Sequence, residues 1–221
     1  RQYQVKRPVT KKVIFDHLRG KRHYGVYLLN GSCTTAAVAD FDKPDPLPIF
    51  EFTAAARHYG LEPCIELSKS KGFHVWAFFE TTGVPSVKAR MVANHILSEI
   101  GTPDVELFPK QDQLNGQVTS GNYILAPLFG GLVSKGKTVF VHPATLKPYS
   151  DQWEFLSRIE RVPESILDDI IEINELETPV KSPQPNVKLP PLGANVFGLP
   201  ICAQTMLRNG VSRYQRVSCF R

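Results

Sequence analysis

Short apolar or aromatic runs and longer amphipathic segments follow one another along most of the chain. Strands are predicted where apolar and β-branched residues cluster between turn signals, at 24–29, 36–41, 64–67, 74–79, 105–108, 123–128 and 138–141. Helices are predicted where apolar residues recur at helical spacing, at 13–18, 50–58, 86–100, 153–159 and 163–173. The two kinds of element do not alternate strictly. The pattern therefore predicts an α+β fold rather than a doubly wound parallel sheet.

The composition changes after Leu176, where a stretch rich in proline begins. Such a stretch is typical of a linker. We therefore predict one large domain over residues 1–176, a linker over 177–195 and the start of a further helical region over 196–221. The chain begins with Arg1 rather than Met, and we expect it to be part of a longer protein.

Charge and composition narrow the class of protein only slightly. The formal net charge is +5, which permits a polyanionic partner such as nucleic acid without requiring one. No apolar run is long enough to cross a membrane, and no signal segment opens the chain. The cysteines, which include no C-x-x-C pair, are Cys33, Cys64, Cys202 and Cys219. We expect a reducing prokaryotic cytoplasm, no membrane contact and no disulfides.

Two acids, Asp40 and Asp42, end the predicted strand at 36–41. Side chains alternate along a strand, so both carboxylates point to one face, about 7 Å apart along the chain. A divalent cation with oxygen ligands would neutralise them, as in two-metal phosphoryl transfer. Taken alone, the pattern is weak, because two acids so spaced are more often a strand end that faces solvent.

A basic, glycine-containing segment at 68–74 runs directly into an aromatic strand. Ser70, Lys71 and His74 supply hydroxyl, ammonium and imidazole groups, and Gly72 brings backbone amides close to a ligand. These are the groups that a triphosphate requires. The alternative is a solvated basic turn, with His74 packed near Trp76.

A third carboxylate lies on the predicted strand at 105–108. Glu106 is a candidate metal ligand, although a lone acid on a strand is also an ordinary surface residue. Lys110 follows the break at Pro109, and Asn122 precedes the next strand. Both are candidate nucleotide-binding residues, and Asn122 is equally suited to capping a turn.

Taken in order, these segments resemble the archaeo-eukaryotic primase superfamily over about residues 13–145. Within it, the chain is most similar to the primase-polymerases of TOTE-type conflict systems and to CRISPR-associated primase-polymerases, and residues 68–74 are also similar to the polymerase domains of bacterial end-joining ligases. The segments that carry the resemblance are 17–21, 24–27, 39–42, 72–76, 108–111, 121–122 and 126–128. Two positions depart from the usual pattern, with Gly72 in place of serine and Glu106 in place of aspartate.

The resemblance implies an RRM-like antiparallel sheet that carries the acids and is flanked by helices. It also implies template-dependent nucleotidyl transfer from dNTPs or NTPs on single-stranded or primed DNA. The residues implied to hold two Mg²⁺ or Mn²⁺ ions are Asp40, Asp42 and Glu106. The residues implied to bind the triphosphate are Ser70, Lys71, Gly72 and His74, with Lys110 and Asn122 as further candidates.

The segment that begins near Leu199 is similar to the entry to the iron–sulfur domain of primase large subunits. In that family the cysteine after proline, here Cys202, is a cluster ligand. A cluster needs four ligands, and only Cys219 lies nearby, so a complete cluster is expected only in a longer protein. Within this chain Cys202 fits a buried helical cysteine equally well.

Two other classes of protein remain open from the residues alone. A metal nuclease often places an acid and an E-x-K on one hairpin, a spacing that Glu106 and Lys110 do not match. A catalytically weak module of a conflict or mobile-element system would bind single strands without chemistry. The aromatic residues that would stack on bases, or else belong to the core, are Phe15, Tyr24, Tyr27 and Trp153.

Overall fold

The computed structural model describes residue 5, residues 9–114 and residues 121–177. The predicted linker and the predicted C-terminal region, with Cys202 and Cys219, lie outside the described residues. Within the described part, no helix has the length and apolar character needed to cross a membrane.

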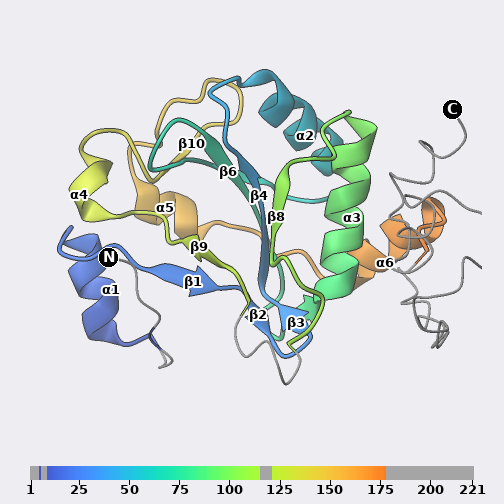
Figure 1. Cartoon of the computed structure of the whole chain (residues 1–221). Helices are drawn as coiled ribbons and strands as arrows, with labels where there is room; N and C mark the ends of the chain where they lie inside the picture. Colours follow the sequence, from blue (N-terminus) through green and yellow to red (C-terminus); the bar gives the residue numbers. More distant parts are fainter. Residues whose placement is uncertain (1–4, 6–8, 115–120, 178–221) are drawn as a thin grey trace, which may run out of the picture. The chain divides into compact units, whose positions relative to one another are not determined.

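A five-stranded antiparallel sheet forms the centre of the domain, in the order β10-β5-β6-β4-β8 (Figure 1). Its strands are β4 (Ala36–Phe41), β5 (Cys64–Leu67), β6 (Phe73–Phe78), β8 (Glu106–Phe108) and β10 (Val139–Val141). With the helices between them, β4, β5, β6 and β8 follow the order βαββαβ along the chain. This is the ferredoxin-like arrangement of RRM-type sheets. The predicted RRM-like antiparallel sheet is therefore confirmed.

Three helices cover one face of this sheet (Figure 1). They are α2 (Leu47–His58), α3 (Ser86–Glu99) and α6 (Glu164–Ile173). Apolar side chains from these helices, among them Ile49, Val92 and Leu167, form the main core with alternate residues of the strands. Ala37, Ala39 and Phe41 of β4 point into this core, as the alternation of side chains along a strand requires.

The other face of the sheet is also covered. A two-stranded ribbon of β1 (Gly25–Tyr27) and β9 (Tyr123–Leu125) lies over it, together with α5 (Gln152–Ser157) (Figure 1). Val38, Trp76 and Phe108 form a second apolar cluster beneath this cover. The sheet is therefore covered by other elements on both of its faces.

The first helix, α1 (Lys11–Leu18), packs against the short helix α4 (Gly130–Val133) through glycine. A Cβ built at Gly130 would lie 1.9 Å from the carbonyl oxygen of Leu18, so only glycine fits there. The imidazole Nε2 of His17 lies 2.8 Å from the carbonyl oxygen of Pro127, and burial lowers the pKa of His17. A neutral ring donating to this carbonyl ties α1 to the segment that follows β9.

The predicted elements occur close to their expected positions, with ends that differ by up to three residues. The elements that the sequence pattern did not reveal are short: α4 and a small sheet of β2 (Leu29–Asn30), β3 (Cys33–Thr34) and β7 (Val84–Pro85). Strands of two residues carry too little periodicity to be recognised in a sequence.

Candidate active site

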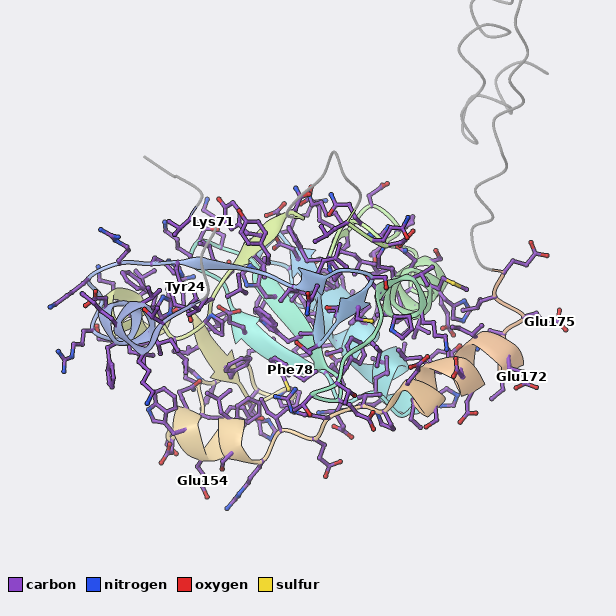
Figure 2. All side chains as sticks on the ribbon, turned by 90° about the horizontal axis from the view of Figure 1, so that it is seen from below. Tyr24, Lys71, Phe78, Glu154, Glu172 and Glu175 are labelled. Atoms are coloured by element: carbon purple, nitrogen blue, oxygen red, sulfur yellow. The ribbon has the colours of Figure 1, made fainter. Side chains whose placement is uncertain are left out.

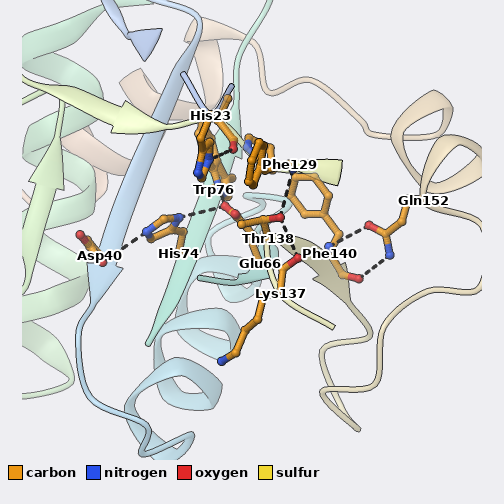
Figure 3. Close-up of polar contacts among 12 residues, drawn as sticks. His23, Asp40, Glu66, His74, Trp76, Phe129, Lys137, Thr138, Phe140 and Gln152 are labelled. Atoms are coloured by element: carbon orange, nitrogen blue, oxygen red, sulfur yellow. Dashed lines mark hydrogen bonds and ion pairs between the residues drawn. The ribbon is translucent and has the colours of Figure 1, made fainter. Parts of the chain in front are cut away.

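Four polar residues form a row across four neighbouring strands of the central sheet. Glu66 of β5 is the register partner of His74 of β6, which pairs with Asp40 of β4, which pairs with Glu106 of β8. Directly opposite residues in a sheet point to the same face. The row therefore presents three carboxylates and one imidazole on the face that also carries Trp76 and the second apolar cluster. Figure 3 shows Asp40, His74 and Glu66 of this row beside Trp76.

The row is buried at one end and open at the other. The Glu66 side chain is 1% exposed, that of His74 8%, that of Asp40 21% and that of Glu106 54%. The row therefore reaches solvent at Glu106, its most exposed member.

At the buried end, both hydrogen bonds to Glu66 reach the same oxygen. The His74 Nδ1 atom lies 2.9 Å from Glu66 Oε2, and the indole Nε1–H of Trp76 donates to that oxygen at 2.7 Å (Figure 3). Burial by itself would lower the pKa of His74. The hydrogen bond and charge of Glu66, with the charges of Asp40 and Asp42, outweigh it, so the pKa of His74 lies above its usual value. The Nε2 atom of His74 faces Asp40, toward the open end of the row.

Asp40 lies next in the row, with Oδ1 3.6 Å from His74 Nε2. Burial raises the pKa of Asp40, and the charges of Asp42, Glu106 and Glu66 raise it further, although His74 acts in the opposite direction. Asp42 follows the end of β4 and is exposed. Negative charge is thus concentrated at the end of β4, which is the electrostatic condition that favours a bound cation.

Glu106 forms an ion pair with Lys110, whose Nζ lies 2.8 Å from Glu106 Oε2. The same ammonium group lies 5.0 Å from the centroid of the Phe108 ring. The segment that carries Lys110 is fixed by α3, because Arg90 donates to the carbonyl oxygen of Pro109 and to Asp112. Lys110 is therefore held at the mouth of the site, beside the most exposed acid.

The carboxylates of this site form a donor set of the kind that a divalent cation uses. Over the described residues, no group of three or more His, Cys, Asp or Glu side chains is arranged, as it stands, to hold a metal ion. The backbone positions nevertheless suit one, because Asp40 and Glu106 are register partners and Asp42 follows two residues later. Their carboxylate oxygens are the ligands that Mg²⁺ and Mn²⁺ prefer. Glu106 would have to leave Lys110 to join Asp40 and Asp42.

The hairpin between β5 and β6 lies beside the acids. A Cβ built at Gly72 would lie 2.0 Å from the carbonyl oxygen of Phe41 and 2.9 Å from the Cα atom of Asp42. Only glycine therefore lets this hairpin approach the end of β4. The carbonyl of Gly72 accepts from the amide of Ser68 at 3.0 Å, which closes the loop.

Ser70 and Lys71 are exposed at the tip of this hairpin. Lys137 Nζ donates to the carbonyl oxygen of Ser70 at 2.6 Å, which adds a second ammonium group to the loop. Lys71 projects from the opposite side of the domain to Glu154 (Figure 2). The loop thus gathers hydroxyl and ammonium groups next to Asp42.

Asn122, the last of the predicted binding residues, lies outside the row. Its Oδ1 atom accepts from Gln111 Nε2 at 2.8 Å, and Gln111 directly follows Lys110. Asn122 is therefore connected to the acids only through the segment that carries Lys110.

Glu66 belongs to the candidate site but is not among the residues that the sequence pattern predicts for it. A single acid within a short apolar strand looks the same whether it is exposed or buried. The available signal is its spacing: Glu66 and His74 flank a hairpin at positions that the pairing of Leu67 with Phe73 places opposite each other. This spacing identifies Glu66 only when the pairing register of β5 with β6 is already known.

The fold and the site define an α+β domain with acids at the end of a central strand and a basic hairpin beside them. The sequence matches the family described as "TOTE conflict system, Archaeo-Eukaryotic Primase domain" over residues 1–170. The chain belongs to this family of archaeo-eukaryotic primase domains, which is related to primases and polymerases. The predicted resemblance is thus confirmed.

Among solved structures, the chain is similar to the polymerase domain of Ligase D from Mycobacterium tuberculosis in complex with DNA. The sequence identity is 18%, the TM-score is 0.32, and the match covers 70% of this chain and 60% of that chain. No curated protein matches the sequence.

Proposed function

We propose that this domain is a DNA primase-polymerase that transfers nucleotides from dNTPs or NTPs to a growing strand on a DNA template. The observation that carries the proposal is the row of Asp40, Glu106 and His74 in register on three adjacent strands, beside the hairpin of Gly72. Carboxylates next to triphosphate-binding groups are what nucleotidyl transfer requires. Membership of a primase family supports the proposal.

Each group has a separate task in this proposal. Asp40, Asp42 and Glu106 would hold two Mg²⁺ or Mn²⁺ ions, with Lys110 released from Glu106 as they do so. Bound ions supply Lewis-acid activation of the attacking 3′-hydroxyl and of the leaving pyrophosphate. His74 donates from Nε2 to the triphosphate, and the hydroxyl and ammonium groups of Ser70 and Lys71 bind its outer oxygens. Lys110 and Asn122 line the approach to these groups.

The experiment that tests the proposal is extension of a primed template with Mn²⁺ and labelled dNTPs. Wild type is compared with the double variant Asp40→Ala/Asp42→Ala. We expect extension by wild type and none by the double variant, because the loss of two carboxylates removes most of the oxygen ligands. An unprimed template with NTPs present then measures initiation. Absence of both extension and triphosphate binding in wild type would sink the proposal.

A second candidate function is a catalytically weak module that binds single strands. The observation that favours it is a pair of tyrosines on the outer side of the β1–β9 ribbon. Tyr27 and Tyr123 are register partners with ring centroids 6.3 Å apart, and they are 38% and 39% exposed. A Cβ at Gly25 would lie 2.3 Å from the Tyr123 ring, so glycine makes room for that ring.

These tyrosines yield a prediction that holds for either function. The variant Tyr27→Ala/Tyr123→Ala is expected to bind a single-stranded oligonucleotide at least about tenfold more weakly, because stacking contributes about 1–3 kcal/mol per base. Fluorescence anisotropy with labelled oligo-dT measures the affinity. Trp153→Ala is the matched control, since Trp153 is 59% exposed and lies on α5. Equal losses in both variants would refute a specific role for the tyrosine pair.

A further inference from the structure

We propose that one side of the domain, made of α1, α4 and the β5–β6 hairpin, binds a single strand of nucleic acid next to the candidate site. The segments concerned are 9–22, 68–72 and 130–137, and together they are called the basic surface. The inference deepens the proposed function, on which it rests, because it places the strand on the domain.

Positive charge is concentrated in the three segments of the basic surface. They contain nine Lys and Arg residues, of which five lie in 9–22, two in 68–72 and two in 130–137. The single acid among them, Asp16, forms an ion pair with Lys12 at 2.6 Å. Such an excess of one sign attracts a polyanion and speeds its association.

The opposite charge is concentrated elsewhere in the domain. Residues 151–177, the segment that contains α5 and α6, have nine Asp and Glu residues against two Arg. Lys71 of the basic surface and Glu154 of α5 lie on opposite sides of the domain (Figure 2). The small net charge of the whole chain, +5, therefore conceals a strongly polarised domain.

Close contacts join the three segments to one another and to the candidate site. A Cβ built at Gly20 would lie 2.5 Å from the amide nitrogen of Gly131, so the turn after α1 touches α4. Lys137, which follows α4, donates from Nζ to the carbonyl oxygen of Ser70 in the hairpin. Gly72 brings that hairpin against the end of β4. A strand bound along the basic surface would therefore run beside the acids.

An exposed aromatic side chain lies within the basic surface. Phe15 of α1 is 56% exposed, and the guanidinium carbon of Arg19 lies 5.7 Å from the centroid of its ring. An exposed ring among cations stacks on unpaired bases, which a duplex does not offer. Phe15 therefore favours a single strand over a duplex, and the continuity with a candidate nucleotide site favours nucleic acid over an anionic lipid surface.

The test measures binding of labelled oligo-dT to the whole chain by fluorescence anisotropy at several salt concentrations. The variant Arg19→Gln/Lys21→Gln/Lys135→Gln removes three exposed cations of the basic surface. We expect it to bind at least about tenfold more weakly at low salt. The slope of log affinity against log salt should become shallower by about 2, because each phosphate contact on a single strand contributes about 0.7.

The matched control removes the same charge outside the basic surface. Arg57→Gln/Lys147→Gln/Arg158→Gln replaces three other exposed cations. Its affinity is expected to stay within about threefold of wild type, with an unchanged salt slope, because none of its cations touches the strand. Thermal melting shows whether each variant is folded.

Phe15→Ala separates stacking from charge. Its affinity for oligo-dT is expected to fall at least about fivefold, because stacking on an aromatic ring contributes strongly to binding of each base. The salt slope should not change, since no cation is lost. An unchanged affinity in folded Phe15→Ala would overturn the choice of a single strand as the partner.

The remaining outcomes separate this inference from the proposed function. Equal losses in the two triple variants, or unchanged binding in the folded surface variant, would overturn the inference alone. Binding of phosphatidylserine vesicles but not of oligo-dT would overturn it in favour of a lipid surface. The surface variant is expected to bind a non-hydrolysable dATP analogue in Mn²⁺ like wild type in calorimetry. A wild type that neither extends a primer nor binds this analogue would overturn the proposed function and the inference together.

Discussion

Asp40→Asn is expected to lower the rate of primer extension by about a thousandfold while raising the stability of the domain. The loss follows from the central place of Asp40 in the row, between His74 and Glu106. The gain follows from the raised pKa of Asp40, which shows that burial and the neighbouring carboxylates disfavour its charged form. Asparagine keeps the shape and loses the charge. Extension assays and thermal melting measure the two effects.

The difference in stability between Asp40→Asn and wild type should depend on pH, and this dependence tests the explanation given for the gain. A carboxyl whose pKa is higher in the folded state costs stability when it is ionised, and this cost fades as the pH falls through the folded pKa. The difference in melting temperature between Asp40→Asn and wild type should therefore shrink from neutral toward acid pH. Thr35→Ala, on the same chain segment but exposed, is the control and should change neither property. A variant that loses activity and also loses stability would contradict this explanation.

Gly72→Ala is expected to destabilise the domain by about 2–3 kcal/mol and to abolish triphosphate binding. The added Cβ would lie 2.0 Å from the carbonyl oxygen of Phe41, so either the hairpin or the end of β4 must move. Both carry residues of the candidate site, because Asp42 follows Phe41 and Ser70 and Lys71 precede Gly72. Chemical denaturation and calorimetry with a dATP analogue measure the two losses.

The matched control is Gly136→Ala. Gly136 has a φ of +66°, and a Cβ there meets nothing within 4 Å. The control therefore carries only a backbone penalty of about 1 kcal/mol and should bind the triphosphate normally. If Gly72→Ala bound the triphosphate like wild type, the hairpin would not need its close contact with β4.

The central elements could be predicted from sequence because their signals are local. Residues 36–41 and 64–67 are apolar runs bounded by turn signals, and both form strands with the predicted bounds. The small sheet of β2, β3 and β7 could not be predicted, because its strands are two residues long. Their stability comes from pairing across the chain rather than from local pattern.

The candidate site could be predicted in part for the same reason. Asp40 and His74 could be predicted as site residues because each occurs in a short motif. The structure places the two residues directly opposite each other on neighbouring strands. Glu66 did not stand out, because its meaning depends on strand pairing with His74 and on burial at 1% exposure. The ion pair of Lys110 with Glu106 depends on a turn at Pro109 that the sequence only marks as a break.

The row of polar residues also has a consequence for how the sheet assembles. A slip of one residue in the pairing of β5 with β6 would turn Glu66 or His74 toward the apolar core beneath α2 and α3. A charged group there would lack every partner that it has in the native pairing. The groups proposed for chemistry therefore also destabilise incorrect strand registers. If these residues were replaced by apolar ones, a shifted register would no longer bury a charged group, and misaligned pairings would become more favourable.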